Sequence, residues 1–326
     1  MTGVQTCALP IWALAAGAVG APATAQTSPA KPVRVVVGTA AGGGVDAISR
    51  ITGARLAERW PHAIVVENRA GAGGAVASEF VAKSVPDGHT LLTISIAYSV
   101  IPASHRNLGY DPVRDLAPVT VLVNAPNVLV AHPSVPVRTV KGLIALAQSG
   151  RGLDELQYAS SGNGSPAHLA GELLRLLSGA NFVHVPYKGT SPAMTDLIGG
   201  RVSFSFGSIV SSVPHVKTGK LRLLAATGSR RAASLPQTPT IAEAGVAGYA
   251  VDVWYAMLAP AAPPRAGMRM LNHEVTRVLH AAEQRERLAD MGLEPVGESL
   301  DASARYIDAE IAKWAKVVRA ARISAQ

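Results

Sequence analysis

The chain of 326 residues contains a single cysteine, Cys7, so no disulfide can form within it. Aromatic residues are also scarce, at 5%, and charged residues make up 16%, whereas hydrophobic residues reach 48%. This composition is typical of a globular protein and excludes a disordered chain. At roughly 150 residues per domain, the length predicts two domains.

Long apolar runs are missing after the N-terminal region. No later run approaches the roughly 20 residues that a helix needs to cross a bilayer. Basic residues outnumber acidic residues by 30 to 22, but they are scattered and form no block interleaved with aromatic residues. This pattern argues against a nucleic-acid partner. The net charge of +8 favours anionic small molecules slightly, and mainly affects solubility.

Residues 1–25 are interpreted as an export signal that lies outside the fold. The stretch "WALAAGAVGAPATAQ" is apolar and small, and Ala23–Ala25 forms an A-x-A site, which predicts cleavage before Gln26. The usual basic start is missing, because the first basic residue is Lys31. Residues 1–11 match the translation of a common sequencing-library adapter, which indicates an artefact at the true start. The alternative is an unusual natural signal.

From Lys31 onward, expected strands and helices alternate. The β-branched run "VRVVVGTA" is typical of a buried strand, and "VDAISRITGARLAERW" has apolar residues at helical spacing with Asp46 as its expected N-cap. The order of strand, Gly- or Ser-rich turn and helix returns in the second half of the chain. This order predicts an α/β fold with mainly parallel sheets covered by helices on both faces.

Two long β-rich runs could connect the two domains. The first, 116–135, is broken by Ala125-Pro126 and would carry the chain into the second domain. The second, "VDVWYAMLAPAAPP" at 251–264, would carry it back; its aromatic pair is expected to pack in the core or hinge. Two helices are expected to follow, at 269–292 and 301–321.

Three loops of small residues precede expected helices. In "YASSGNGSPAHLAGELLRLLSG", the run Ser160–Ser165 leads into a helix with Ser165 as N-cap and Pro166 at its first position. "PYKGTSPAM" repeats this with Ser191-Pro192, and "GTAAGGGVD" leads into the first helix. A helix start exposes unpaired N–H groups that favour carboxylate or phosphate, and ligands of α/β sheets lie outside the carboxyl ends of the strands. The alternative is that all three are only caps and turns.

Enzyme signatures are missing. The chain has no G-x-G-x-x-G, P-loop or G-x-S-x-G motif, so the residues predict no dinucleotide site and no catalytic nucleophile. His168 and Glu172 are four residues apart on a helix, but no third metal ligand accompanies them. We therefore expect no enzyme, no cofactor and no metal.

The ordered motifs "GGGVDAISR", "VVENRAGAGG", "PDGHTLL", "YDPVRDLAPVT", "YASSGNGSPAHLAGEL", "VHVPYKGTSPAMTDLIGG" and "LPQTPTIAEAG" resemble those of the Bug receptors, the substrate-binding proteins of tripartite tricarboxylate transporters. The resemblance spans 31–321. It implies a periplasmic, monomeric receptor with a type II-like Venus flytrap fold, in which two crossover strands join the domains around a ligand cleft. The domains would be 27–124 plus 249–326, and 125–248. The ligand would be a small carboxylate, delivered to a membrane permease; the alternative is a ligand sensor that docks on a membrane signalling protein.

Matching by motif, the resemblance implies ligand contacts at Thr39, Ala40, Gly42, Gly43, Gly44, Asp46, Ser95, Ala97, Ser160, Ser161, Gly162, Gly164, Ser165, His168, Tyr187, Lys188 and Gly189. Two departures stand out. Family members often have "PFPPGGG" where this chain has Gly38–Ala41 before its glycines. Many carry an aspartate at about Gly207, which could pair with an ammonium group; its absence favours a plain carboxylate over an amino acid.

Overall fold

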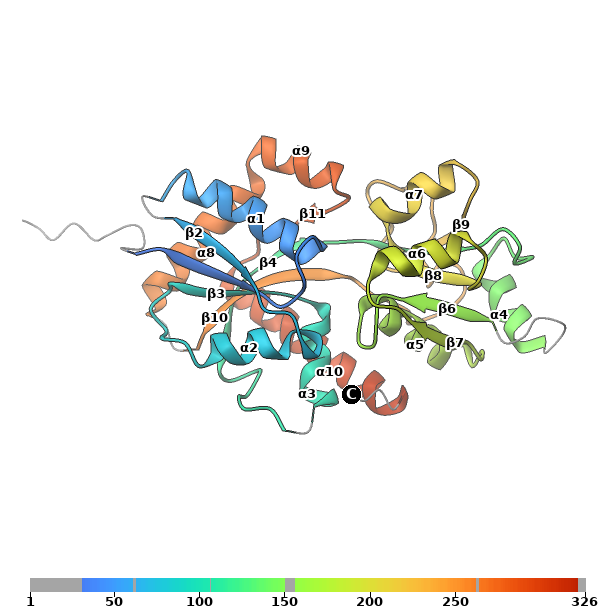
Figure 1. Ribbon diagram of the computed structural model, residues 1–326, viewed down its shortest axis with the longest axis horizontal. Coiled ribbons are helices and arrows are strands. Elements are labelled where there is room, and N and C mark those ends of the chain that lie inside the picture. The colour runs from blue at the N-terminus through green and yellow to red at the C-terminus, as the bar shows by residue number, and fades with distance from the viewer. Residues whose placement is uncertain (1–30, 61–62, 106, 150–155, 262–263, 322–326) are drawn as a thin grey trace, which may run out of the picture.

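The computed structural model describes residues 31–60, 63–105, 107–149, 156–261 and 264–321. The expected signal segment, with Cys7 and the cleavage position before Gln26, lies outside the described residues. Figure 1 shows two lobes side by side, each with its own β-sheet and its own helices. Within the described ranges, no helix has the length and apolar character needed to cross a membrane.

The first lobe contains a six-stranded sheet in the order β11-β4-β10-β3-β1-β2. Its strands are β1 (Val33–Val37), β2 (Ile64–Asn68), β3 (Thr90–Ser95), β4 (Leu116–Asn124), β10 (Trp254–Pro260) and β11 (Glu294–Pro295). Its helices are α1 (Gly44–Ala57), α2 (Ala75–Ala82), α3 (Ile101–Ser104), α8 (Arg265–His280), α9 (Ala282–Asp290) and α10 (Leu300–Ala321), with the 3₁₀ turns η1 (Ala72–Gly74) and η2 (Ile96–Val100).

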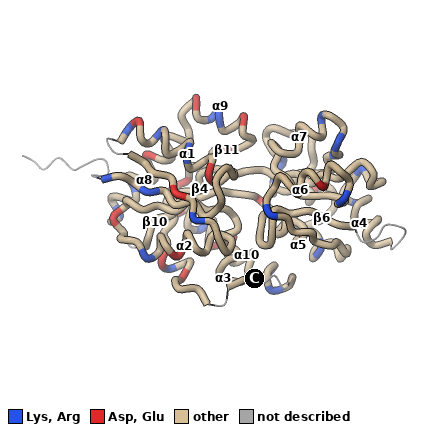
Figure 2. Tube along the Cα trace, in the orientation of Figure 1, with Lys and Arg blue, Asp and Glu red and all other residues tan. Residues whose placement is uncertain are grey.

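The second lobe contains a five-stranded sheet in the order β7-β6-β8-β5-β9. Its strands are β5 (Asn127–Ala131), β6 (Gln157–Ser160), β7 (Val183–Pro186), β8 (Phe204–Ser208) and β9 (Arg222–Ala226). Its helices are α4 (Val140–Ser149), α5 (Pro166–Ser178), α6 (Thr190–Ile198) and α7 (Ile209–Lys217). Figure 2 shows acidic and basic residues interspersed over the first lobe, whereas basic residues predominate on the second lobe.

Both sheets are mixed, so the expectation of mainly parallel sheets was wrong. Strands β1, β2 and β3 are parallel, as are β6, β7 and β8, but β10 runs antiparallel to β3 and β5 runs antiparallel to β8. The antiparallel strands flank the points where the chain changes sheet: between β4 and β5 through Ala125-Pro126, and between β9 and β10 on the return. The strand–helix–strand order makes neighbouring strands parallel. A strand that enters the sheet from the other lobe is not preceded by such a helix crossover, so it can pair antiparallel.

Three other elements differ from the sequence-based expectations. The apolar stretch "HTLLTISIAY" predicts a strand, but β3 ends at Ser95 and the chain continues as η2. The helix expected at 269–292 is interrupted at Ala281, whose extended backbone (φ −59°, ψ 138°) separates α8 from α9. Helix α7 is not among the elements expected from the sequence, and it contains Pro214 in its interior.

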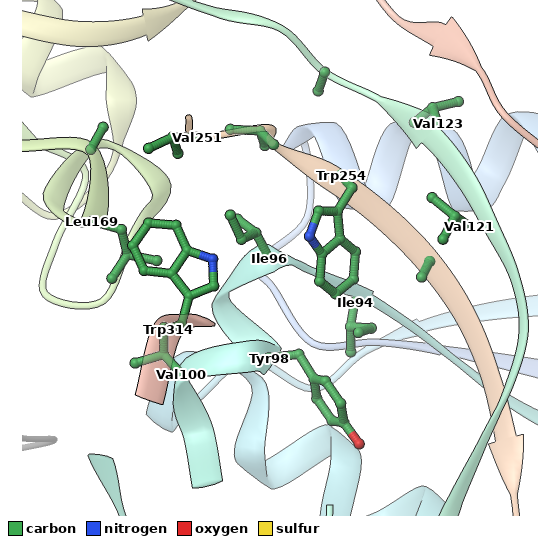
Figure 3. Packing of buried hydrophobic residues seen from close by; sticks show 14 of the residues in the cluster. Ile94, Ile96, Tyr98, Val100, Val121, Val123, Leu169, Val251, Trp254 and Trp314 are labelled. Atoms are coloured by element: carbon green, nitrogen blue, oxygen red, sulfur yellow. The ribbon is translucent and has the colours of Figure 1, made fainter. Parts of the chain in front are cut away.

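The largest apolar core continues from one sheet to the other. Helix α10 of the first lobe contacts α5 of the second, and Figure 3 shows Leu169 of α5 beside Trp314 of α10 within this core. The buried carboxylate of Glu310 accepts hydrogen bonds from the indole N–H groups of Trp254 (3.2 Å) and Trp314 (3.0 Å). The two lobes are therefore joined by packed side chains as well as by two chain crossings.

Candidate ligand-binding site

Helix α1 begins earlier than expected, after the loop that follows β1. Gly43 is the N-cap, with an extended backbone (φ −82°, ψ 171°), and α1 begins at Gly44. Asp46 therefore lies inside the first turn, and its expected role as N-cap was wrong. The glycine leaves the cap position without a side chain, so the first turn keeps its N–H groups open.

Asp46 instead fixes the shape of this loop. Its carboxylate accepts hydrogen bonds from the N–H of Gly42 (2.9 Å), from Asn68 Nδ2 (2.9 Å) and from Arg50. Burial of the carboxyl group raises its pKa, but these hydrogen bonds outweigh burial and keep the pKa of Asp46 below its ordinary value. Asn68 Nδ2 also donates to the carbonyl of Thr39 at 3.1 Å. We infer that Asp46 holds the loop in place and leaves anion contacts to its neighbours.

Unpaired donors remain at the start of α1. Among the described residues, the N–H groups of Gly43, Gly44 and Val45 have no hydrogen-bond partner, and Gly43 and Gly44 are exposed, as is Ala40. At the neighbouring strand end, the hydroxyl of Ser95 accepts from the N–H of Ala97 at 3.3 Å and keeps its own proton free to donate. This edge of the sheet therefore offers several donors and no free carboxylate.

The loop between β6 and α5 confirms the expected helix start. Ser165 is the N-cap of α5, its hydroxyl accepts from the N–H of His168 at 3.4 Å, and Pro166 occupies the first helical position. Gly162 (φ 135°) and Gly164 (φ 72°) adopt backbone conformations that side chains rarely allow. The small run is therefore needed for a tight turn before the helix.

Several N–H groups of this loop are already occupied. The N–H of Gly162 donates to the hydroxyl of Ser160 (3.1 Å), that of Gly164 donates to Nδ1 of His168 (3.0 Å), and that of Ser165 donates to the carbonyl of Gly162 (3.2 Å). These groups fix the loop, and a ligand could reach them only by displacing those partners.

The next loop is tied to this one by backbone bonds. The N–H of Tyr187 donates to the carbonyl of Ser160 (2.9 Å), and the N–H of Gly189 donates to that of Ser161 (3.2 Å). The N–H groups of Ser161 and Asn163 have no partner among the described residues. In the β6–α5 loop, a ligand would thus find free N–H groups at Ser161 and Asn163.

A stacked histidine pair supports the β6–α5 loop. The rings of His168 and His184 lie 4.0 Å apart at 10°, and Nε2 of His184 lies 2.6 Å from the hydroxyl of Ser160. Burial lowers the pKa of His168, and burial together with His168 lowers the pKa of His184 to about 4. Both rings are therefore neutral at pH 7. Ser160 is buried and His184 is a weak base, so this Ser–His contact is suited to structural support.

His168 and Glu172, which the sequence places four residues apart as possible metal ligands, are both hydrogen-bonded to other groups. His168 Nδ1 accepts from the loop, while the Glu172 carboxylate accepts from the hydroxyl of Tyr158 (3.0 Å) and pairs with Arg175 (2.7 Å). In the part of the chain that the structure describes, no group of three or more potential metal ligands is present.

The loop between β7 and α6 also begins its helix earlier than expected. Gly189 (φ 119°) is the N-cap and α6 begins at Thr190, so Ser191 is not the cap. The hydroxyl of Tyr187 donates to Asp196 at 2.8 Å, which removes it as a free donor. Lys188 is exposed and forms no ion pair with any described residue, so it is available to attract an anion.

A fourth strand-end helix start was missed. β8 ends at Ser208, whose hydroxyl accepts from the N–H of Ser211 (3.2 Å) as the N-cap of α7. The signal for it is the Ser-x-x-Ser spacing. A side chain at the buried Gly207 would meet Ser212 Oγ at 2.3 Å and Met194 Cε at 3.5 Å. A side chain at position 207 would therefore enter the space between α6 and α7, and an aspartate there would require Ser212 to move.

The loops are gathered at the carboxyl ends of parallel strands in both lobes. In Figure 1, the start of α1 lies on the side of the first lobe that faces the second, and the loop before α5 lies on the facing side of the second lobe. Each side presents unpaired N–H groups, and the second adds Lys188. Such an arrangement can hold an anion through backbone donors from two sides.

Comparisons with known proteins identify relatives across almost the whole chain. The family model described as "Tripartite tricarboxylate transporter family receptor" matches residues 48–323. BugT of Bordetella pertussis is 34% identical over 312 residues, covering 94% of each chain. The "UPF0065 protein in tcbD-tcbE intergenic region" of Pseudomonas sp. is 35% identical, covering 91% of this chain and 88% of that one.

Solved structures share the fold. A protein of R. palustris solved with adipate is 36% identical, with a TM-score of 0.80 over 91% of this chain and 99% of its own. MatC from Rhodopseudomonas palustris with bound malate is 33% identical, with a TM-score of 0.77 over 89% and 99%. The periplasmic binding protein BugD is 29% identical, with a TM-score of 0.77. Fold and family are those of solute-binding receptors, and the chain belongs to the tripartite tricarboxylate transporter receptor family, as its resemblance to the Bug receptors predicted.

Proposed function

We propose that this protein is a periplasmic receptor that captures a small carboxylate between its two lobes and delivers it to a tripartite tricarboxylate-type permease. The observation that carries the proposal is the set of unpaired N–H groups at strand ends of both lobes, at Gly43, Gly44, Ser161 and Asn163. Relatives solved with adipate and with malate support the ligand class. Among the residues that the structure describes, these loops carry no unpaired carboxylate that would repel such an anion.

Binding would replace the water around the anion by fixed donors. Helix starts supply N–H groups and a partial positive charge, and the exposed Lys188 adds a full positive charge on the second lobe. The division into domains 27–124 plus 249–326 and 125–248 is part of the proposal, with the two crossings as hinges. Closure around the ligand would bury it and create the form that the permease recognises.

The proposal is tested by a binding screen on the chain from Gln26, which we expect to be a monomer. The protein is unfolded and refolded to remove carried-over ligand, then heated with dicarboxylates, tricarboxylates, aromatic acids, amino acids and sugars. A ligand at a hundredfold excess over its Kd stabilises the native state by about 2.7 kcal/mol, enough to raise the Tm by a few degrees. We expect such a shift with adipate, malate or a similar carboxylate. Sugars alone raising the Tm would contradict the proposal.

A further inference from the structure

The phenol of Tyr255 lies at the start of α1, beside the unpaired N–H groups of the first lobe. A Cβ built on Gly44 would lie 2.5 Å from the Tyr255 hydroxyl oxygen and 3.1 Å from Cε2 and Cζ of its ring. The hydroxyl therefore occupies the space next to the first residue of α1. Any residue larger than glycine at position 44 would push the ring away.

The strand pairing places further hydroxyl groups on the same face of the sheet. In the antiparallel pair β3–β10, Tyr255 lies opposite Ser95 and Met257 lies opposite Thr93. Residues opposite each other in such a pair have their side chains on the same face, about 5 Å apart at Cβ. Tyr255, Ser95 and Thr93 thus share the face on which α1 begins. Thr93 is fully buried, and its hydroxyl has no partner among the described residues.

The Tyr255 hydroxyl itself makes no hydrogen bond to any described residue. Burial of the side chain raises the pKa of Tyr255 to about 12, so the phenol keeps its proton at neutral pH and can donate it. A partly buried donor without a partner is costly unless a solvent or ligand atom accepts from it. A carboxylate oxygen is a suitable acceptor and would also receive the N–H of Gly44.

We propose that Tyr255 is a ligand-binding residue, whose hydroxyl donates to the carboxylate held at the start of α1. This inference rests on the proposed function and adds a side chain that the loop motifs do not contain. Ser95, opposite Tyr255 on β3 and on the same face of the sheet, would donate to the same carboxylate. Gly44 would be required because a side chain there displaces the phenol.

The test compares Tyr255→Phe with the unchanged protein by isothermal titration with adipate, malate and whichever carboxylate the screen identifies. Losing a hydrogen bond to a charged group is expected to weaken Kd about 10- to 100-fold. Tyr110→Phe is the matched control, because Tyr110 is buried in the same lobe with a pKa also raised to about 12 by burial, but lies in the loop before β4. Its Kd should equal that of the unchanged protein.

Gly44→Ala provides a second readout that does not remove the hydroxyl. It should weaken binding as Tyr255→Phe does, and combining both changes should weaken it little further, because both act on the same contact. If Tyr255→Phe fails to fold, the Kd of Gly44→Ala tests the role of Tyr255 instead. Folded variants that bind as tightly as the unchanged protein would overturn the role of Tyr255 and leave the receptor proposal intact. If the unchanged protein binds no carboxylate, both proposals fail.

Discussion

His168 determines the shape of the β6–α5 loop through one ring nitrogen. Its Nδ1 accepts the N–H of Gly164, while its own backbone N–H donates to the hydroxyl of Ser165. Glycines at 162 and 164 supply the positive φ angles that this turn needs. The six small residues therefore form a turn that leaves the N–H groups of Ser161 and Asn163 unpaired, and the hydrogen bond to His168 holds this turn in place.

Replacing His168 by phenylalanine should loosen this turn. The ring can still stack on His184, but the N–H of Gly164 loses its acceptor, so we expect the free energy of unfolding to fall by about 1 kcal/mol. Carboxylate affinity should fall too, because the N–H groups of Ser161 and Asn163 are no longer held. Urea denaturation and titration measure the two effects. Unchanged values for both would show that the turn keeps its shape without the histidine.

The stacked pair of His168 and His184 predicts that acid weakens the fold. His184 has a pKa lowered from 6.5 to about 4, so the unfolded chain takes up a proton below about pH 6.5 while the folded chain resists until about pH 4. The free energy of unfolding should therefore fall as the pH falls through that window, and these histidines should add no slope above it. Denaturation curves at several pH values test this. His184→Gln should reduce the slope, and an equal slope in that variant would assign it to other groups.

At the scale of whole elements, the caps show what the sequence could and could not predict. The start of α5 was predicted because Ser165-Pro166 combines a capping side chain with a proline at the first position. The starts of α1 and α6 were misplaced because Gly43 and Gly189 cap through their backbone, which leaves no side-chain signal. The alternating pattern predicted the α/β class, but the order of the strands depends on contacts far apart in the sequence.

The role of Tyr255 illustrates the same limit. The sequence places it on the strand that returns to the first lobe, with packing as the expected role. Only the register of β10 against β3 brings it opposite Ser95, and only the packing of α1 brings Gly44 to its hydroxyl. Neither contact leaves a local pattern.

The cap of α5 provides a direct test at this scale. Ser165→Ala removes the acceptor for the N–H of His168 and should lower the free energy of unfolding by about 1 kcal/mol. Ser191→Ala is the matched control, because Ser191 lies inside the first turn of α6 and its side chain caps nothing. Chemical denaturation of both variants gives the comparison. Equal losses would mean that the Ser165 hydroxyl contributes no capping energy.

At the scale of the molecule, the two lobes are linked around the chain crossings. The Glu294 carboxylate of β11 accepts from Arg230 (2.7 Å) and from the N–H of Ala233 (3.1 Å), both on the segment between β9 and β10. Gly292, after α9, approaches Val210 of α7 so closely that a Cβ would lie 2.8 Å from that side chain. Together with the α5–α10 contact, these interactions tie each lobe to the other beside the chain crossings.

This continuity predicts that both lobes unfold together. Scanning calorimetry should give one transition, with equal calorimetric and van't Hoff enthalpies, because the largest core contains residues of both sheets. Leu169→Ala removes a fully buried side chain at the junction with Trp314 and should cost about 2–5 kcal/mol, and we expect it to split or broaden the transition. Leu197→Ala is the control, since Leu197 is equally buried but belongs to a separate core within the second lobe. It should lower the Tm while keeping a single transition.

Two transitions in the unchanged protein would mean that the junction packs too weakly to couple the lobes. Closure around a ligand would then be opposed by little more than the hinges.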